Sequence, residues 1–262
     1  MQSGYAEVNG LRMYYEVQGE GAPIVLIHGS FGTSNDLGKL ASLLAKSRKV
    51  IMPEMQGHAR TADIPRELSY EAMADDVAGL LKQLNVEKAD VLGYSMGGGV
   101  AFQMGIRHPE QVGKLVVLSG VYKHDGWWPE AEAAFPTLSA DLLKDTPIKT
   151  QYDSLSPHPD KFDAFIRKTI SIDLTPYDWT TDVEQIANPI YMVIGDADGV
   201  RYEHALELIC MKGGGKMGDS GDMPESRMAI LPGTTHTGMP ERAEWLAPMI
   251  NEFLDAKTAT GR

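Results

Sequence analysis

Short apolar runs that alternate with helical segments are the feature of this sequence that most limits how the chain can fold. Residues 24–27 and 115–118 are continuous apolar runs, which is typical of strands buried on both faces of a sheet. Residues 69–84 place apolar side chains on one helical face, and residues 97–107 form a predicted helix that ends before a His-Pro pair. This alternation predicts an α/β fold with a mostly parallel sheet that is covered by helices on both faces.

Two segments depart from the alternation. Residues 5–17 are predicted to form a hairpin around Asn9-Gly10, a dipeptide that supplies two positive φ angles for a tight turn. Residues 121–181 contain no apolar strand and instead scatter aromatic residues among Pro, Asp and Ser. We therefore predict a single domain over residues 1–262, with a small helical insertion at 121–181.

Charge and cysteine content narrow the possible partners. The chain of 262 residues carries a formal net charge of −12, which repels phosphate backbones and anionic lipids, so we expect neither a nucleic acid nor a membrane partner. No apolar run approaches the roughly 20 residues needed to span a bilayer. Cys210 is the only cysteine, and residues 1–10 lack the pattern of a signal peptide. These features predict a cytoplasmic protein, and they leave its oligomeric state open.

The segment Gly93-Tyr94-Ser95-Met96-Gly97 lies between a predicted strand and a predicted helix. A serine in this position occupies a sharp, strained turn that lifts its hydroxyl above the sheet, and the glycines avoid collisions at that turn. The bare Gly-x-Ser-x-Gly pattern also occurs by chance in surface loops, but the flanking strand and helix argue against that interpretation here. We predict that Ser95 is a nucleophile.

A serine hydroxyl needs a general base, and the base needs a third group that orients it. His236 follows the last apolar strand, whereas a surface or core role is the simpler interpretation of the other histidines. Asp196 and Asp198 both follow the preceding strand, and either could supply the carboxylate. The resulting order of Ser, Asp and His along the chain is the order of the α/β-hydrolase triad.

From about Tyr5 to Leu254 the chain resembles the α/β-hydrolase superfamily. The resemblance is carried by the Gly-x-Ser-x-Gly motif, by the order of Ser, Asp and His along the chain, and by the segment His28-Gly29-Ser30-Phe31-Gly32. The resemblance implies that Asp198 is the acid, because the family places it three residues after a glycine. It also implies an oxyanion hole formed by the N–H groups of Ser30 and Met96, and a short cap at 121–181. The loop at 53–61 departs from the family pattern at Glu54 and Ala59, and we interpret that loop as structural.

The serine at the nucleophile position argues against the dehalogenase and epoxide-hydrolase members, which use Asp. The leading hypothesis is a carboxylic-ester hydrolase that acts on small esters or lactones through an acyl-enzyme. Phe31, Trp127, Trp128 and Trp179 are the predicted substrate-binding residues. No metal or nucleotide motif is present, so no metal or other cofactor is expected. A carbon–carbon bond hydrolase, a cofactor-free perhydrolase, a hydroxynitrile lyase and a non-catalytic binding protein remain as alternatives.

Overall fold

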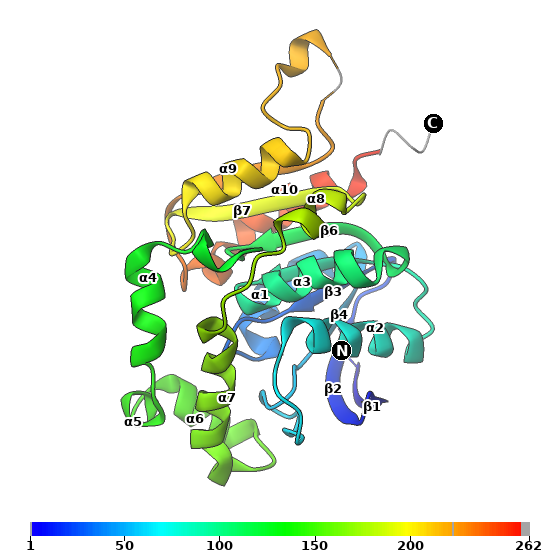
Figure 1. Cartoon of the computed structure of the whole chain (residues 1–262). Helices are drawn as coiled ribbons and strands as arrows, with labels where there is room; N and C mark the ends of the chain where they lie inside the picture. Colours follow the sequence, from blue (N-terminus) through cyan, green and yellow to red (C-terminus); the bar gives the residue numbers. More distant parts are fainter. Residues whose placement is uncertain (1, 222, 258–262) are drawn as a thin grey trace.

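An eight-stranded sheet forms the centre of the computed structural model, which describes residues 2–221 and 223–257 (Figure 1). The strands lie in the order β1-β2-β4-β3-β5-β6-β7-β8. Their bounds are β1 Gln2–Val8, β2 Leu11–Gln18, β3 Ala22–Ile27, β4 Arg48–Pro53, β5 Ala89–Tyr94, β6 Val112–Leu118, β7 Ile190–Ala197 and β8 Arg227–Thr235.

The sheet is antiparallel at one edge and parallel elsewhere. β1 and β2 form the predicted hairpin, with Asn9 and Gly10 at φ values of 48° and 81°, and β2 pairs antiparallel with β4. The remaining neighbours, from β4 through β3 to β8, are parallel. The predicted α/β class with a mostly parallel sheet is therefore confirmed.

Helices cover both faces of the sheet. Successive side chains of β3 point to opposite faces of the sheet, so the strand contacts both helical layers. Ile24 and Leu26 pack with α1 (Gly38–Leu44) and α10 (Ala243–Asp255) on one face. Val25 and Ile27 pack against the helices on the other face. That second layer contains α2 (Tyr70–Gln83), α3 (Met96–Arg107) and α9 (Tyr202–Met211). In the part of the chain that the structure describes, none of the helices is long and apolar enough to cross a membrane.

The segment between β6 and β7 contains short helices with an apolar core of their own. Five of these helices are α4 (Pro129–Ala134), α5 (Ala140–Leu143), α6 (Pro147–Leu155), α7 (Phe162–Leu174) and α8 (Thr180–Gln185). Helices α4 to α7 lie together beside the sheet (Figure 1). Helices α5, α6 and α7 share a core that is formed by Leu143, Tyr152, Phe162, Phe165, Ile166 and Ile170. We call residues 121–181 the cap.

Candidate active site

Ser95, Asp198 and His236 meet at one edge of the sheet because each directly follows a parallel strand, respectively β5, β7 and β8. The register of β7 and β8 pairs Ala197 with Thr235, so the acid and the histidine follow neighbouring residues. His236 Nδ1 lies 2.8 Å from Asp198 Oδ1, and His236 Nε2 lies 2.9 Å from Ser95 Oγ. The structure therefore brings the three predicted catalytic residues into hydrogen-bond contact.

The turn at Ser95 has the strained geometry that the sequence predicts. Ser95 has φ 54° and ψ −117°, a conformation that non-glycine residues rarely adopt. A Cβ atom at Gly93 would lie 1.8 Å from the Gly97 carbonyl oxygen, and one at Gly97 would lie 2.3 Å from the Ile27 carbonyl oxygen. Both flanking positions therefore require glycine, and the turn holds the serine hydroxyl against His236.

Asp198 is held as an ionised carboxylate next to the imidazole of His236. Its Oδ1 accepts from His236 and from the Val200 N–H, and its Oδ2 accepts from the Ser119 hydroxyl and the Gly195 N–H. Burial acts to raise the pKa of Asp198, but these hydrogen bonds and the nearby imidazole hold that pKa below its ordinary value. The carboxylate therefore fixes the proton on His236 Nδ1 and leaves Nε2 free to accept the proton of Ser95.

Asp196 lies outside this chain of hydrogen bonds. Its side chain is exposed, and Oδ1 accepts from the Thr234 N–H at 3.0 Å. Hydrogen bonds from the backbone N–H groups of Gly233 and Thr234 lower the pKa of Asp196. Of the two carboxylates that the sequence offered, the structure places only Asp198 against His236.

The predicted oxyanion donors Ser30 and Met96 lie in the loop after β3 and at the start of α3. His28 Nε2 accepts from the Met55 N–H, so Nδ1 carries the proton and donates to the Gly29 carbonyl at 2.8 Å. Burial lowers the pKa of His28, which keeps the ring neutral for this role. Because the N–H and C=O groups of a trans peptide point in opposite directions, the Ser30 N–H is directed away from His28. Met96 begins α3, so its N–H has no partner within that helix.

A mainly apolar cavity of about 390 Å³ opens over Ser95 and His236. Phe31 and Trp127 line it as predicted, and the Trp127 ring centroid lies 5.4 Å from that of His236. Trp128 and Trp179 are not among the lining residues that the structure describes, contrary to the prediction. Trp128 packs against Tyr202, and Trp179 stacks on Tyr177 in the core. The apolar lining is completed by cap residues Ala131, Ala134, Phe135, Leu138 and Ile148.

Three polar residues at this site were missed by the sequence analysis. Tyr94 donates its hydroxyl proton to the His236 carbonyl at 2.9 Å, and Ser119 contacts Asp198. Asp173, near the end of α7, lines the cavity itself. Ser119 could have been found, because it directly follows strand β6 at the catalytic edge of the sheet.

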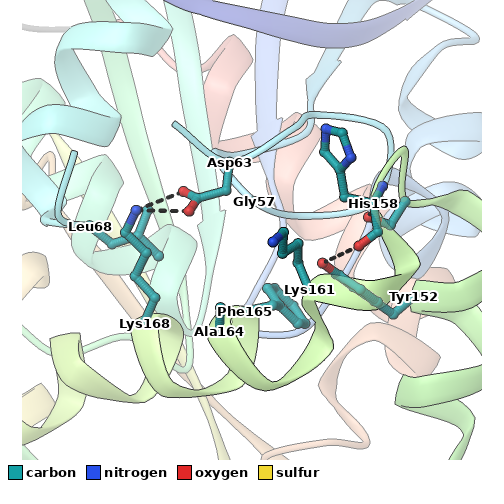
Figure 2. Close-up of a pocket in the computed structure, with 10 residues that line it drawn as sticks. Gly57, Asp63, Leu68, Tyr152, His158, Lys161, Ala164, Phe165 and Lys168 are labelled. Atoms are coloured by element: carbon teal, nitrogen blue, oxygen red, sulfur yellow. Dashed lines mark hydrogen bonds and ion pairs between the residues drawn. The ribbon is translucent and has the colours of Figure 1, made fainter. Parts of the chain in front are cut away.

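A second hollow lies between α7 and the loop that follows β4 (Figure 2). Lys168 pairs with Asp63 there at 2.8 Å, and the Tyr152 hydroxyl donates to the His158 carbonyl. None of the described residues that line this hollow belongs to the Ser95 cavity. Among the described residues, no group of three His, Cys, Asp or Glu side chains is arranged to hold a metal ion.

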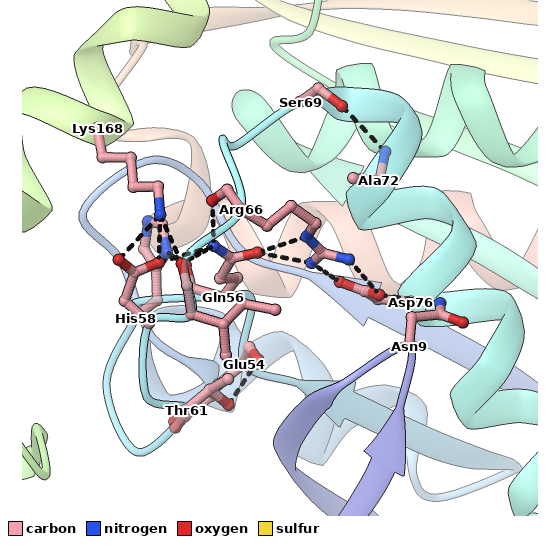
Figure 3. A network of polar contacts seen from close by, with 12 residues as sticks. Asn9, Glu54, Gln56, His58, Thr61, Arg66, Ser69, Ala72, Asp76 and Lys168 are labelled. Carbon is pink, nitrogen blue, oxygen red and sulfur yellow. Dashed lines mark hydrogen bonds and ion pairs between the residues drawn. The ribbon is translucent and has the colours of Figure 1, made fainter.

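The loop that departs from the family pattern is held by buried polar contacts (Figure 3). The Arg66 guanidinium donates from Nε to Gln56 at 2.8 Å and from Nη1 to Asp76 at 3.1 Å. Glu54 is fully buried and accepts from the Ser34 hydroxyl and the Arg60 backbone N–H. None of these side chains is among the described residues that line the Ser95 cavity. This supports the interpretation that the loop has a structural rather than a catalytic role.

Replacement of Trp127 by alanine is expected to change acyl-chain selectivity. Trp127 is buried in the core and also forms a wall of the cavity. Loss of the indole should lower the melting temperature, since such a truncation costs about 3–5 kcal/mol. It should also raise kcat/KM for octanoate esters over butyrate esters by about tenfold, because the cavity lengthens beside His236.

Trp128→Ala is the matched control for this experiment, because Trp128 lies outside the cavity as described. In Trp128→Ala, the ratio of kcat/KM for the octanoate ester to kcat/KM for the butyrate ester should equal that of the wild type. Equal losses on both esters in Trp127→Ala, with an unchanged ratio, would show that Trp127 serves only packing.

Comparisons with known proteins agree with this fold. A family model described as alpha/beta hydrolase fold matches residues 22–205. A 2-hydroxymuconate semialdehyde hydrolase from Pseudomonas sp. (strain CF600) is 37% identical over 114 residues, which cover 42% of this chain and 40% of that protein. An sn-1-specific diacylglycerol lipase from Danio rerio is 26% identical over 190 residues, which cover 69% of this chain and 60% of that protein. The chain thus spans less than two thirds of the length of either relative.

The solved structures give the same fold over nearly the whole chain. The enol-lactonase from Burkholderia xenovorans LB400 matches with a TM-score of 0.75 and 21% identity, covering 97% of this chain and 100% of that one. At this identity the likeness supports the fold alone.

Proposed function

The chain belongs to the α/β-hydrolase family, and from this premise we propose that it is a serine hydrolase that cleaves carboxylic esters, including lactones, through an acyl-enzyme on Ser95. The observation that carries the proposal is the 2.9 Å contact between His236 Nε2 and Ser95 Oγ, made inside a cavity that can take a small acyl group. A protein that only binds a ligand would have no need of a hydroxyl poised against an imidazole.

The proposed mechanism follows from the hydrogen bonds at the site. His236 Nε2 takes the proton of Ser95 as Oγ attacks the ester carbonyl, and Asp198 stabilises the imidazolium that forms. The N–H groups of Ser30 and Met96 stabilise the negative oxygen of the tetrahedral intermediate. His236 then gives its proton to the departing alcohol. In the second half-reaction it activates a water that releases the acid from Ser95.

Carbon–carbon bond hydrolysis is the second candidate, and the semialdehyde hydrolase relative is the observation that favours it. A muconate semialdehyde carries a carboxylate. Among the described residues that line the Ser95 cavity, none is Lys or Arg, and one is the carboxylate of Asp173. An anionic substrate would be repelled there, and for this reason we favour ester hydrolysis.

We further propose that the protein acts on a small molecule in the cytoplasm. The proposed reaction uses no cofactor and involves no nucleic acid or membrane partner. The net charge of −12 supports the absence of nucleic acid and membrane partners, and the single cysteine supports a reducing compartment. The lack of a metal or nucleotide motif in the sequence supports a reaction without a cofactor.

Turnover of a small panel tests the reaction class. The panel holds para-nitrophenyl butyrate, γ-butyrolactone, a butyryl thioester and 2-hydroxymuconate semialdehyde. We expect the butyrate ester to be hydrolysed with a burst of nitrophenol, and rapid quenching to give an intact mass increased by one butyryl group on Ser95. Turnover of the semialdehyde alone would establish the second candidate. Absence of turnover and of any acyl adduct would contradict both.

A further inference from the structure

A carboxylate stands in the wall of the otherwise apolar cavity, close to the reacting atoms. Asp173 belongs to cap helix α7 and lines the same cavity as Ser95 and His236. In the described structure its carboxylate accepts one hydrogen bond, from the Tyr70 hydroxyl, which lies 3.4 Å from Oδ1. Burial raises the pKa of Asp173 to about 6, so the side chain is mostly ionised at neutral pH.

Charge on His124 and His236 would favour the ionised form of Asp173, but among the described residues neither of these histidines forms an ion pair with its carboxylate. Burial raises the pKa values of Tyr70 and Tyr177, so both phenols stay neutral and neither supplies a positive charge. His124 donates from Nε2 to the Asp173 backbone carbonyl at 2.9 Å and faces Glu132 with Nδ1 at 3.3 Å, so neither ring nitrogen bonds the Asp173 carboxylate. Both ring nitrogens of His236 are used by the catalytic residues. Among the described residues, Asp173 has no ion-pair partner within 4.0 Å.

An ionised carboxylate with one long hydrogen bond is costly in an apolar cavity unless a ligand supplies the opposite charge. The remaining walls suit such a ligand. Trp127, Phe135, Phe31 and Tyr94 present aromatic rings to the same space, and aromatic rings attract alkylammonium groups. We propose that the cavity selects esters that carry an alkylammonium group, with Asp173 as its counter-charge. This inference rests on the proposed ester hydrolysis and names the substrate class.

Matched ester pairs measure the preference directly. The acyl-side pair is the para-nitrophenyl ester of γ-trimethylammoniobutyrate and its uncharged analogue with tert-butyl in place of trimethylammonium. The alcohol-side pair is butyrylcholine and its tert-butyl isostere. In at least one pair, the wild type should favour the cationic ester in kcat/KM by about tenfold.

Asp173→Asn should reduce that ratio to about one, because the amide removes the charge and keeps an acceptor for Tyr70. Asp163→Asn is the control on the same helix, since Asp163 is exposed and paired with Arg167 at 2.9 Å. It should keep the wild-type ratio. Equal ratios in the wild type and Asp173→Asn, in both pairs, would overturn the inference and leave ester hydrolysis standing.

A pH series on the wild type tests the same point without a mutation. The ratio of the two esters cancels any effect of pH on the catalytic residues that changes both rates alike. Because a carboxyl group is charged above its pKa, the cation preference should be complete above about pH 7 and should fall as the pH is lowered through 6. A ratio that stays constant from about pH 5 to 8 would contradict a role for Asp173.

Ligand binding keeps the inference testable if no ester is turned over. Phenyltrimethylammonium should quench the fluorescence of Trp127, with a dissociation constant at least about fivefold lower for the wild type than for Asp173→Asn. Binding without any ester hydrolysis would defeat the proposed reaction and support the cation site. Equal binding by the two proteins would defeat the cation site itself.

Discussion

Ser95→Ala is expected to lower kcat for ester hydrolysis by about 10⁵–10⁶ while the protein stays folded. Oγ is the atom that forms the acyl bond, and its hydrogen bond in the structure is made to His236 Nε2. Alanine keeps the Cβ atom, so the strained turn and the start of α3 are retained. The remaining rate of Ser95→Ala should be about 10³–10⁴ times the rate of the uncatalysed reaction in water, because the oxyanion donors and substrate binding are retained.

The measurement is kcat on para-nitrophenyl butyrate, together with labelling by a serine-directed phosphonate. One phosphonate should attach to the wild type, on the peptide that contains Ser95, and none to Ser95→Ala. Ser42→Ala is the control, because Ser42 is a serine of α1 whose hydroxyl donates to the Gly38 carbonyl, outside the cavity as described. Phosphonate inhibition of Ser95→Ala, or retention of more than about a hundredth of the activity, would assign the nucleophile to another residue.

The mostly parallel class of the sheet and the position of the serine could be predicted because both depend on local patterns. Continuous apolar runs identify buried parallel strands, and parallel strands bring their carboxyl ends to one edge. Ser95, Asp198 and His236 each follow such a strand, so sequence position alone places them together. Gly93 and Gly97 were predicted for the steric reason that the structure shows.

The last two strands extend beyond the apolar runs that identify them in the sequence. The apolar runs stop at residues 194 and 231, yet β7 continues to Ala197 and β8 to Thr235. Gly195 and Gly233 suggest a turn, but a Cβ at Gly195 would lie 1.9 Å from the Thr234 carbonyl oxygen. Gly195 therefore permits close approach of two strands, which no one-dimensional pattern distinguishes from a turn.

The cap could not be predicted in the same detail. Trp127 and Trp128 are neighbours in sequence, and only the fold of the cap sends one into the cavity and the other toward Tyr202. Asp173 was missed because a carboxylate on a helix usually faces solvent, and its burial depends on contacts with distant elements such as Tyr70. Tertiary packing, rather than local propensity, decides which cap residues meet the substrate.

Asp198→Asn is expected to lower kcat by roughly 10³–10⁴, whereas Asp196→Asn should change it little. The two oxygens of Asp198 accept from opposite sides, His236 and Val200 on Oδ1, Ser119 and Gly195 on Oδ2. An asparagine has one acceptor oxygen, which the Ser119 and Gly195 donors should attract. Its amino group would then face His236 Nδ1 and donate to it, which places the ring proton on Nε2. A histidine in that tautomer cannot accept the proton of Ser95.

Asp196 provides the matched control because it stands two residues away with the same chemistry and a different environment. Its side chain is exposed and accepts from the Thr234 N–H, a bond that the carbonyl oxygen of asparagine can also make. Both variants should be compared by kcat and by melting temperature, so that a loss of fold is separated from a loss of the general base. A further readout is the pH profile, since the remaining activity of Asp198→Asn should lose the stabilisation of the imidazolium and depend on added hydroxide at high pH. Reversed phenotypes would move the acid to Asp196 and leave Ser95 and His236 in place, because their contact does not pass through either carboxylate.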